Sequence, residues 1–215
     1  MRLFSLLLLC FSSESWAEVT TDHQLWLGAG AKMEVIDDLD IEFTQHVRRV
    51  DNASRTESIM PELGVGYAVL SWFEVAASYR AISENDDEDT RLRGRRVAAS
   101  GELEHGVGPV DLGTRLQWQQ KHVESEASTK LRYRGQVGLD TSTFVSPLVA
   151  YELFVDPGAE RGEQAQKSRV TAGAGMKMSK AHRLKFKYHH QLELDGDGDV
   201  ERIFVLGYRF GFSLK

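Results

Sequence analysis

Alternation of apolar and polar residues at every second position is the feature that most constrains the fold of this chain. The run 182–194 shows it most clearly, because every second residue from Leu184 to Leu194 is apolar apart from His190, and the residues between them are polar. A period of two places successive side chains on opposite faces of a β-strand. The pattern therefore predicts a strand with one apolar face and one charged face.

Ten further runs repeat this alternation along the chain. They are 24–33, 39–48, 60–69, 72–80, 96–104, 109–121, 129–139, 144–154, 167–178 and 204–212. Runs of about ten residues exceed the ~5–6 usual in soluble proteins and match the ~9–11 that cross a bilayer at a tilt. Because an open sheet edge in hydrocarbon leaves backbone groups unpaired, we expect an all-β fold, an antiparallel up-and-down transmembrane β-barrel of about 10–12 strands.

The strand number stays open within that range. Eleven runs are found, whereas single-chain bacterial barrels have an even number of strands. Either a further short strand lies near 18–23, or the run 24–33 does not cross the membrane.

The connections between runs alternate in length. Short ones fall near 34–38, 69–71, 105–108, 140–142 and 179–181, and longer polar ones near 50–57, 83–90, 122–128, 155–166 and 195–199. Transmembrane barrels have short periplasmic turns and longer extracellular loops. Trp26, Trp72 and Trp118 fall near run ends, where such barrels carry interfacial aromatic girdles.

The first residues have the order of a secretory signal peptide. Arg2 supplies a positive charge, a mainly apolar stretch follows up to Leu9, and Ser15-Trp16-Ala17 offers small residues to a signal peptidase. We expect residues 1–17 to be removed and 18–215 to form one barrel domain in the outer membrane of a Gram-negative bacterium. The only cysteine, Cys10, lies within this signal, so the mature chain has no disulfide and no thiolate ligand.

The net charge of −6 gives the chain no overall attraction to nucleic acid. We expect its partners to be outer-membrane lipid, lipopolysaccharide and, during biogenesis, the barrel-assembly machinery. The end of the chain resembles the recognition signal of substrates of that machinery, carried here by Gly207, Phe210 and Phe212. It departs from that signal at Val205, where a polar residue is usual, and in the three residues that follow 212.

The polar faces of the strands are expected to line the barrel lumen. The charged residues predicted to lie there are Glu42, Arg48, Glu62, Glu74, Arg80, Arg96, Glu102, Arg115, Arg132, Arg134, Glu152, Arg169 and Arg209. The planar fork of arginine pairs bidentately with carboxylate, which favours a closed network across the lumen. An excess of arginine favours instead a narrow pore that prefers anions.

Other chemistry receives little support from the residues. No spacing singles out a Ser–His pair, so neither a catalytic residue nor a cofactor is assigned. His189 and His190 fall on opposite faces of a regular strand, and no metal site is predicted. The segment 195–199 resembles a calcium loop, but Leu206 stands where the bidentate glutamate of an EF-hand belongs.

The order of several short motifs resembles a family of outer-membrane β-barrel proteins catalogued as domain of unknown function 2490. The motifs are Trp26, Arg48, Pro61 with Tyr67, Tyr79-Arg80, Leu131-Arg132, Pro147 with Glu152 and Phe154, and Arg169 before a glycine-rich run. The resemblance covers almost the full mature chain and implies a fold and a location, but no catalytic residues.

Three functions therefore remain, and they differ in geometry. A non-enzymatic barrel is either a scaffold with its inward arginines paired to carboxylates or a small passive pore with a gap along its axis. A lipid-modifying enzyme of the Ser/His hydrolase type needs such a pair on the wall near the membrane boundary. A soluble, lipocalin-like periplasmic binding barrel needs an apolar interior.

Overall fold

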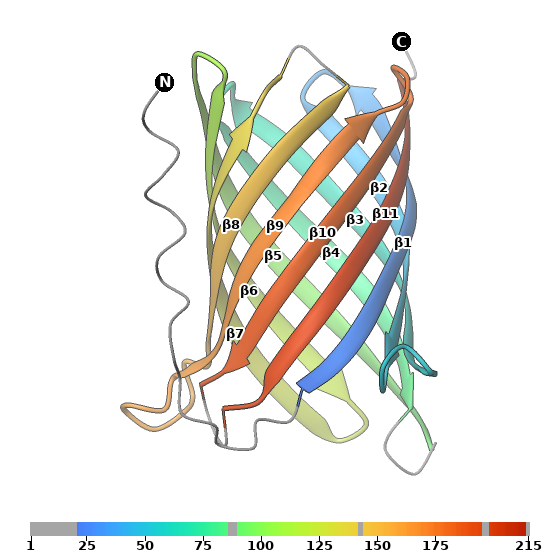
Figure 1. Cartoon of the computed structure of the whole chain (residues 1–215), viewed down its shortest axis with the longest axis vertical. Helices are drawn as coiled ribbons and strands as arrows, with labels where there is room; N and C mark the ends of the chain where they lie inside the picture. The colour runs from blue at the N-terminus through green and yellow to red at the C-terminus, as the bar shows by residue number, and fades with distance from the viewer. Residues whose placement is uncertain (1–20, 86–89, 142–143, 195–197, 214–215) are drawn as a thin grey trace.

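The described strands of the protein form one closed β-barrel (Figure 1). This computed structural model describes residues 21–85, 90–141, 144–194 and 198–213. The signal peptide expected at 1–17 lies outside them, as does most of the segment 195–199. Within the described part of the chain, no α-helix is long and apolar enough to cross a membrane.

Eleven strands make up the barrel in the described residues, and each contains one of the predicted runs to within a residue. They are β1 (Thr21–Ile36), β2 (Leu39–Val50), β3 (Arg55–Leu70), β4 (Phe73–Asn85), β5 (Arg91–Val107), β6 (Val110–Val123), β7 (Glu126–Leu139), β8 (Val145–Val155), β9 (Ala165–Lys177), β10 (His182–Glu193) and β11 (Val200–Ser213). The predicted all-β barrel is confirmed, and the strand number falls within the predicted range.

The closing pair differs from the antiparallel pattern expected throughout. Each strand pairs with its sequence neighbours in antiparallel fashion, whereas β1 and β11 pair in parallel from Thr21↔Val200 to Glu34↔Ser213. An up-and-down barrel with an odd number of strands requires this, because its first and last strands run in the same direction. The run 24–33 therefore lies in the middle of a full-length strand, and residues 21–23 extend that strand at its start.

The connections fall at two rims of the barrel, and several of the longer loops are shorter than the sequence predicts. Those at 37–38, 71–72, 108–109, 140–144 and 178–181 form one rim, and those at 51–54, 86–90, 124–125, 156–164 and 194–199 form the other. The loop predicted near 122–128 is wrong, because β6 and β7 continue to pair as far as Val123↔Glu126. Only Glu124 and Ser125 remain as a turn there.

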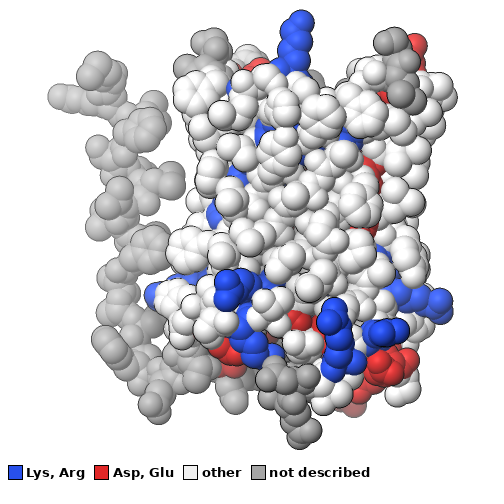
Figure 2. Space-filling view, turned by 90° about the vertical axis from the view of Figure 1, so that its right-hand side faces the viewer, with Lys and Arg blue, Asp and Glu red and all other residues white. Residues whose placement is uncertain are grey.

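Apolar side chains of this barrel lie mainly on the outside. Among the described residues, thirty-two large apolar side chains are exposed and only seven apolar side chains are buried. The exposed ones include Phe43, Leu116, Tyr133 and Val149, each about half accessible. On the face shown in Figure 2, the middle of the barrel is mostly uncharged, and charged side chains gather mainly toward the rim with the longer loops.

The two faces of β6 predict different responses to a new charge. Leu116 lies outside at mid-strand and Gln117 lines the lumen. We expect Leu116→Lys to lower the free energy of unfolding in lipid vesicles by about 2–4 kcal/mol, the cost of a lysine at the bilayer midplane. Gln117→Glu should cost under about 1 kcal/mol, because the lumen is polar and basic and Gln117 stands opposite Arg132 in the strand register. Urea unfolding followed by tryptophan fluorescence measures both, and equal costs would contradict a lipid-facing outer wall.

Candidate functional site

The main cavity of the barrel has a volume of about 630 Å³ and is strongly basic. Thirteen lysine and arginine side chains line it, against five glutamates. A second cavity of about 230 Å³ adjoins it near the rim of the shorter turns, where Lys32, Asp40 and Glu74 contribute. Both cavities are enclosed by the inward rows of side chains, which follow from the alternation along each strand.

The structure brings most of the predicted lumen residues to this site. Eleven of the thirteen line the main cavity. Glu74 lines the smaller one, and Glu102 stands opposite Glu74 and Arg115 in the strand register. The prediction considered only arginine and glutamate, so it omitted five lysines that the same alternation places inside: Lys121, Lys130, Lys167, Lys185 and Lys187.

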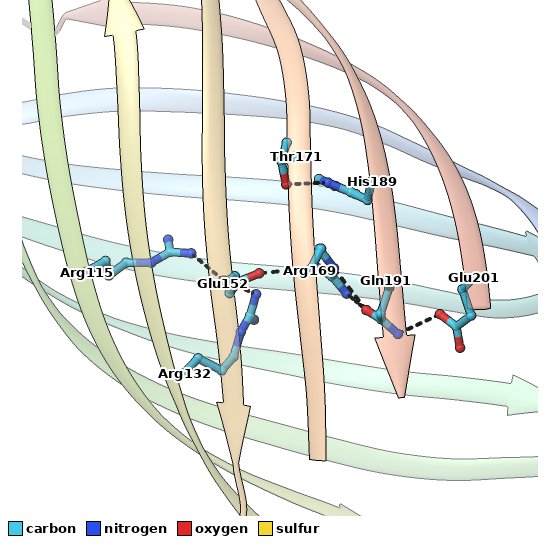
Figure 3. Close-up of polar contacts among 8 residues, drawn as sticks. All are labelled: Arg115, Arg132, Glu152, Arg169, Thr171, His189, Gln191 and Glu201. Atoms are coloured by element: carbon cyan, nitrogen blue, oxygen red, sulfur yellow. Dashed lines mark hydrogen bonds and ion pairs between the residues drawn. The ribbon is translucent and has the colours of Figure 1, made fainter. Parts of the chain in front are cut away.

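Glu152 is the centre of one arginine cluster (Figure 3). Its carboxylate accepts a hydrogen bond from Arg132 Nη2 at 2.8 Å and one from Arg169 Nη1 at 3.4 Å, and Arg115 Nη2 lies at 3.8 Å. Arg169 continues the network by donating from Nε to Gln191 Oε1 at 2.9 Å. Because Glu152 is buried, these arginines provide the partners that its charge requires.

Glu62 is the centre of a second arginine cluster, formed by β3, β4 and β5. Its Oε2 accepts hydrogen bonds from Arg80 Nε at 2.5 Å and from Arg96 Nη2 at 3.0 Å. Arg80 Nη2 also lies 3.3 Å from Nε2 of His46 on β2. Glu62, Arg80 and Arg96 are direct neighbours in the strand register, so the ladder itself places them side by side.

Trp26 lies inside the barrel, and its predicted place in an outer aromatic girdle is wrong. It lines the main cavity, and its ring faces the guanidinium carbons of Arg48 at 4.1 Å and of Arg169 at 5.1 Å from the ring centre. Its Nε1 donates to Gln24 Oε1 at 3.0 Å. The face of an indole attracts a guanidinium, so Trp26 holds two like-charged arginines of the lumen close to one another.

Phe154 plays a similar part for two arginines of the Glu152 cluster. The guanidinium carbons of Arg132 and Arg169 lie 4.7 and 4.9 Å from its ring centre. Phe154 is buried, whereas Trp72 and Trp118 are exposed on the outside. Parity along the strand, rather than closeness to a strand end, decides which aromatic side chains enter the lumen.

Two hydroxyl–histidine pairs occur in the described residues. His182 Nδ1 lies 2.6 Å from the hydroxyl of Tyr208 in an exposed position, and the second pair faces the lumen. Thr171 Oγ1 and His189 Nδ1 lie 2.7 Å apart, and both residues line the main cavity. His190, next along the strand, is exposed. In the described residues, no group of three or more His, Cys, Asp or Glu is arranged to hold a metal ion.

The three residues of the predicted assembly signal lie on β11. Gly207 faces the main cavity, whereas Phe210 and Phe212 are exposed and stack on each other with ring centres 5.7 Å apart. Both aromatic rings lie near the end of β11 at the rim of the shorter turns. Recognition by an assembly machinery stays a prediction.

Fold and site together define a closed single-chain β-barrel with a basic, charge-networked lumen. The chain belongs to the family described as protein of unknown function DUF2490, whose model matches residues 23–202. That range runs from β1 to the start of β11, so it contains nearly the whole barrel. Comparison with curated proteins gives no match.

The cluster around Glu152 predicts a large stability effect. Glu152→Gln removes the only carboxylate that Arg132 and Arg169 contact in the described residues. We expect the free energy of unfolding to fall by about 3–5 kcal/mol, because breaking a buried pair leaves uncompensated charges. Glu84→Gln is the control, since its partner Lys121 is 40% exposed at the side chain, and it should cost under about 1 kcal/mol. Urea unfolding in lipid vesicles distinguishes the two, and a small loss in both variants would contradict the role given to Glu152.

Proposed function

We propose that this protein is an integral outer-membrane β-barrel that forms a narrow passive pore with a preference for small anions. One observation carries the proposal. Thirteen basic side chains face the main cavity against five acidic ones, although the chain as a whole has a net charge of −6. The fold therefore concentrates positive charge inside a protein that is acidic overall.

The outer surface supports the membrane location. Contiguous apolar patches beyond a few hundred Å² are rare on soluble monomers, and each apolar side chain gains about 1.5–3 kcal/mol when fully covered. The thirty-two exposed large apolar side chains of the described residues therefore favour a hydrocarbon environment. A strand of 14 residues such as β6 rises roughly 46 Å, and at ~45° it spans roughly 33 Å, close to the ~30 Å of a bilayer core.

The same distribution argues against the soluble alternative. A lipocalin-like barrel binds its ligand in an apolar interior, whereas charged and amide side chains line the main cavity here. The Thr171–His189 pair also faces that cavity. A lipid-modifying enzyme of the Ser/His type would need a serine beside a histidine on the outer wall, whereas the exposed His182 contacts the phenol of Tyr208.

The arginine clusters give the lumen its selectivity in this proposal. Glu62 binds two arginines and Glu152 contacts three, so each cluster keeps an excess of positive charge. Fixed charges at a constriction set which ions enter a narrow pore. Side chains that bridge the lumen also keep the pore narrow, which predicts a small conductance.

Single-channel recording in a planar bilayer tests the pore. We expect small unitary steps with a reversal potential that shows anion preference, and Arg132→Glu should shift that potential toward cation preference. Arg202→Glu is the matched control, because Arg202 is exposed on the outside of β11 and the same charge change there should leave the reversal potential unaltered. If protein shown to be folded and inserted carries no current, the pore proposal is wrong and a closed scaffold remains.

Cell fractionation tests the membrane location separately. The full-length protein should co-purify with outer-membrane vesicles, resist extraction by alkaline carbonate, and migrate faster on a gel before boiling than after it. Folded barrels resist unfolding by cold detergent because no edge of the sheet is open. Recovery in the soluble periplasmic fraction would overturn the location and favour a soluble binding barrel.

A further inference from the structure

Three cations of the main cavity stand apart from the arginine clusters. Arg134 on β7 and Lys185 and Lys187 on β10 all line the cavity. None of them makes an ion pair or a side-chain hydrogen bond within the described residues. In contrast, the nearby Arg115 and Arg209 contact carboxylates at 3.8 and 3.4 Å.

These three cations lie near one another. Lys185 and Lys187 are two residues apart on β10, so they enter the cavity from the same face of that strand. Arg134 lines the same cavity and is near enough for its like charge to act on Lys187. Glu42 already contacts Arg209, and Glu152 already contacts three arginines. The cavity therefore holds an excess of positive charge that its own carboxylates do not neutralise.

The wall beside these cations leaves room for a ligand. In the strand register Lys185 is followed by Gly207 on β11 and then by Gly28 on β1, and both glycines line the cavity. A Cβ atom at Gly28 would lie 3.7 Å from the His46 ring and one at Gly207 would lie 3.7 Å from Lys185 Cβ. A longer side chain at either position would extend into the space that the cations face.

We propose that Arg134, Lys185 and Lys187 form a binding site for a small oxyanion with two or more negative charges, of the phosphate or pyrophosphate type. The guanidinium of Arg134 offers a planar fork to two oxygens, and each ammonium offers three donors. A monovalent anion such as chloride neutralises only one of the three charges and accepts no bidentate contact. The site deepens the proposed anion pore, because it names the solute class that the lumen holds most strongly.

Isothermal titration with inorganic pyrophosphate tests the site on the full-length protein purified in detergent from expressing cells. We expect saturable binding that sodium chloride at matched ionic strength does not reproduce. Lys187→Gln and Arg134→Gln should each weaken it about tenfold, the value of one charge-assisted hydrogen bond. Lys121→Gln removes the same charge from the same cavity, but Lys121 is paired with Glu84 at 3.0 Å, and it should change the affinity by less than about threefold.

A second variant probes the space rather than the charge. Gly28→Leu keeps every cation but places a side chain in the space near Lys185. It should therefore abolish saturable pyrophosphate binding. The gel mobility before and after boiling shows whether each variant is folded. Equal loss of pyrophosphate affinity in Lys121→Gln and Lys187→Gln would show that only the overall positive charge of the lumen matters, and it would overturn the site. The absence of saturable binding to the unaltered protein would overturn it too.

The outcome is independent of conduction, because binding in a micelle needs no open path through the barrel. A protein that conducts anions but does not bind pyrophosphate loses this site and keeps the pore. A protein that binds pyrophosphate with the expected dependence on Lys187 and Gly28, yet stays silent in a bilayer, keeps the site and loses the pore.

Discussion

Closure of the backbone hydrogen-bond ladder is the constraint on which the rest of this structure depends. Every strand is paired on both sides, and the parallel seam of β1 with β11 completes the ring over Thr21↔Val200 to Glu34↔Ser213. Closure fixes the parity of every strand relative to its neighbours, because a slip of one residue would exchange its two faces. An outer wall of apolar side chains and an inner wall of charged ones follow from that single choice of register.

Register also decides which charges meet inside. Glu62, Arg80 and Arg96 lie side by side on β3, β4 and β5 because the ladder pairs their positions directly. The cluster around Glu152 depends in addition on stagger, since Arg115 on β6 reaches across β7 to contact it. Burying these charges is costly, and the barrel offsets the cost by giving both the buried Glu152 and the half-buried Glu62 several guanidinium donors. Arg134, Lys185 and Lys187 make no ion pair among the described residues, and Gly207 and Gly28 follow Lys185 in the strand register.

Much of this arrangement could be predicted from alternation alone, and the exceptions have definable causes. Closeness to the end of a run predicts an outer girdle position for Trp26, yet its parity is that of Gly28 and places it in the lumen. Polar residues near 122–128 predict a loop, yet they continue the pairing of β6 and β7. The parallel seam joins the first and last strands, and the partners of Glu152 depend on how far arginine side chains reach across β6 to β9. No alternation within one strand encodes either. The lysines of β10 were within reach, because they alternate as regularly as the arginines.

The inner belt of side chains suggests how the proposed pore distinguishes anions from cations. Inward side chains of successive strands line one cavity as a ring around the lumen, from Trp26 and Arg48 through the Glu62 and Glu152 clusters to Gln191. Each cluster in that ring holds more guanidinium than carboxylate charge. An entering oxyanion can therefore bind the arginines as a further acceptor, while Glu62 and Glu152 keep their partners. A cation offers no acceptor to the arginines and is repelled by their excess positive charge. In the proposed pore, the interactions that narrow the lumen are therefore the ones that make it selective.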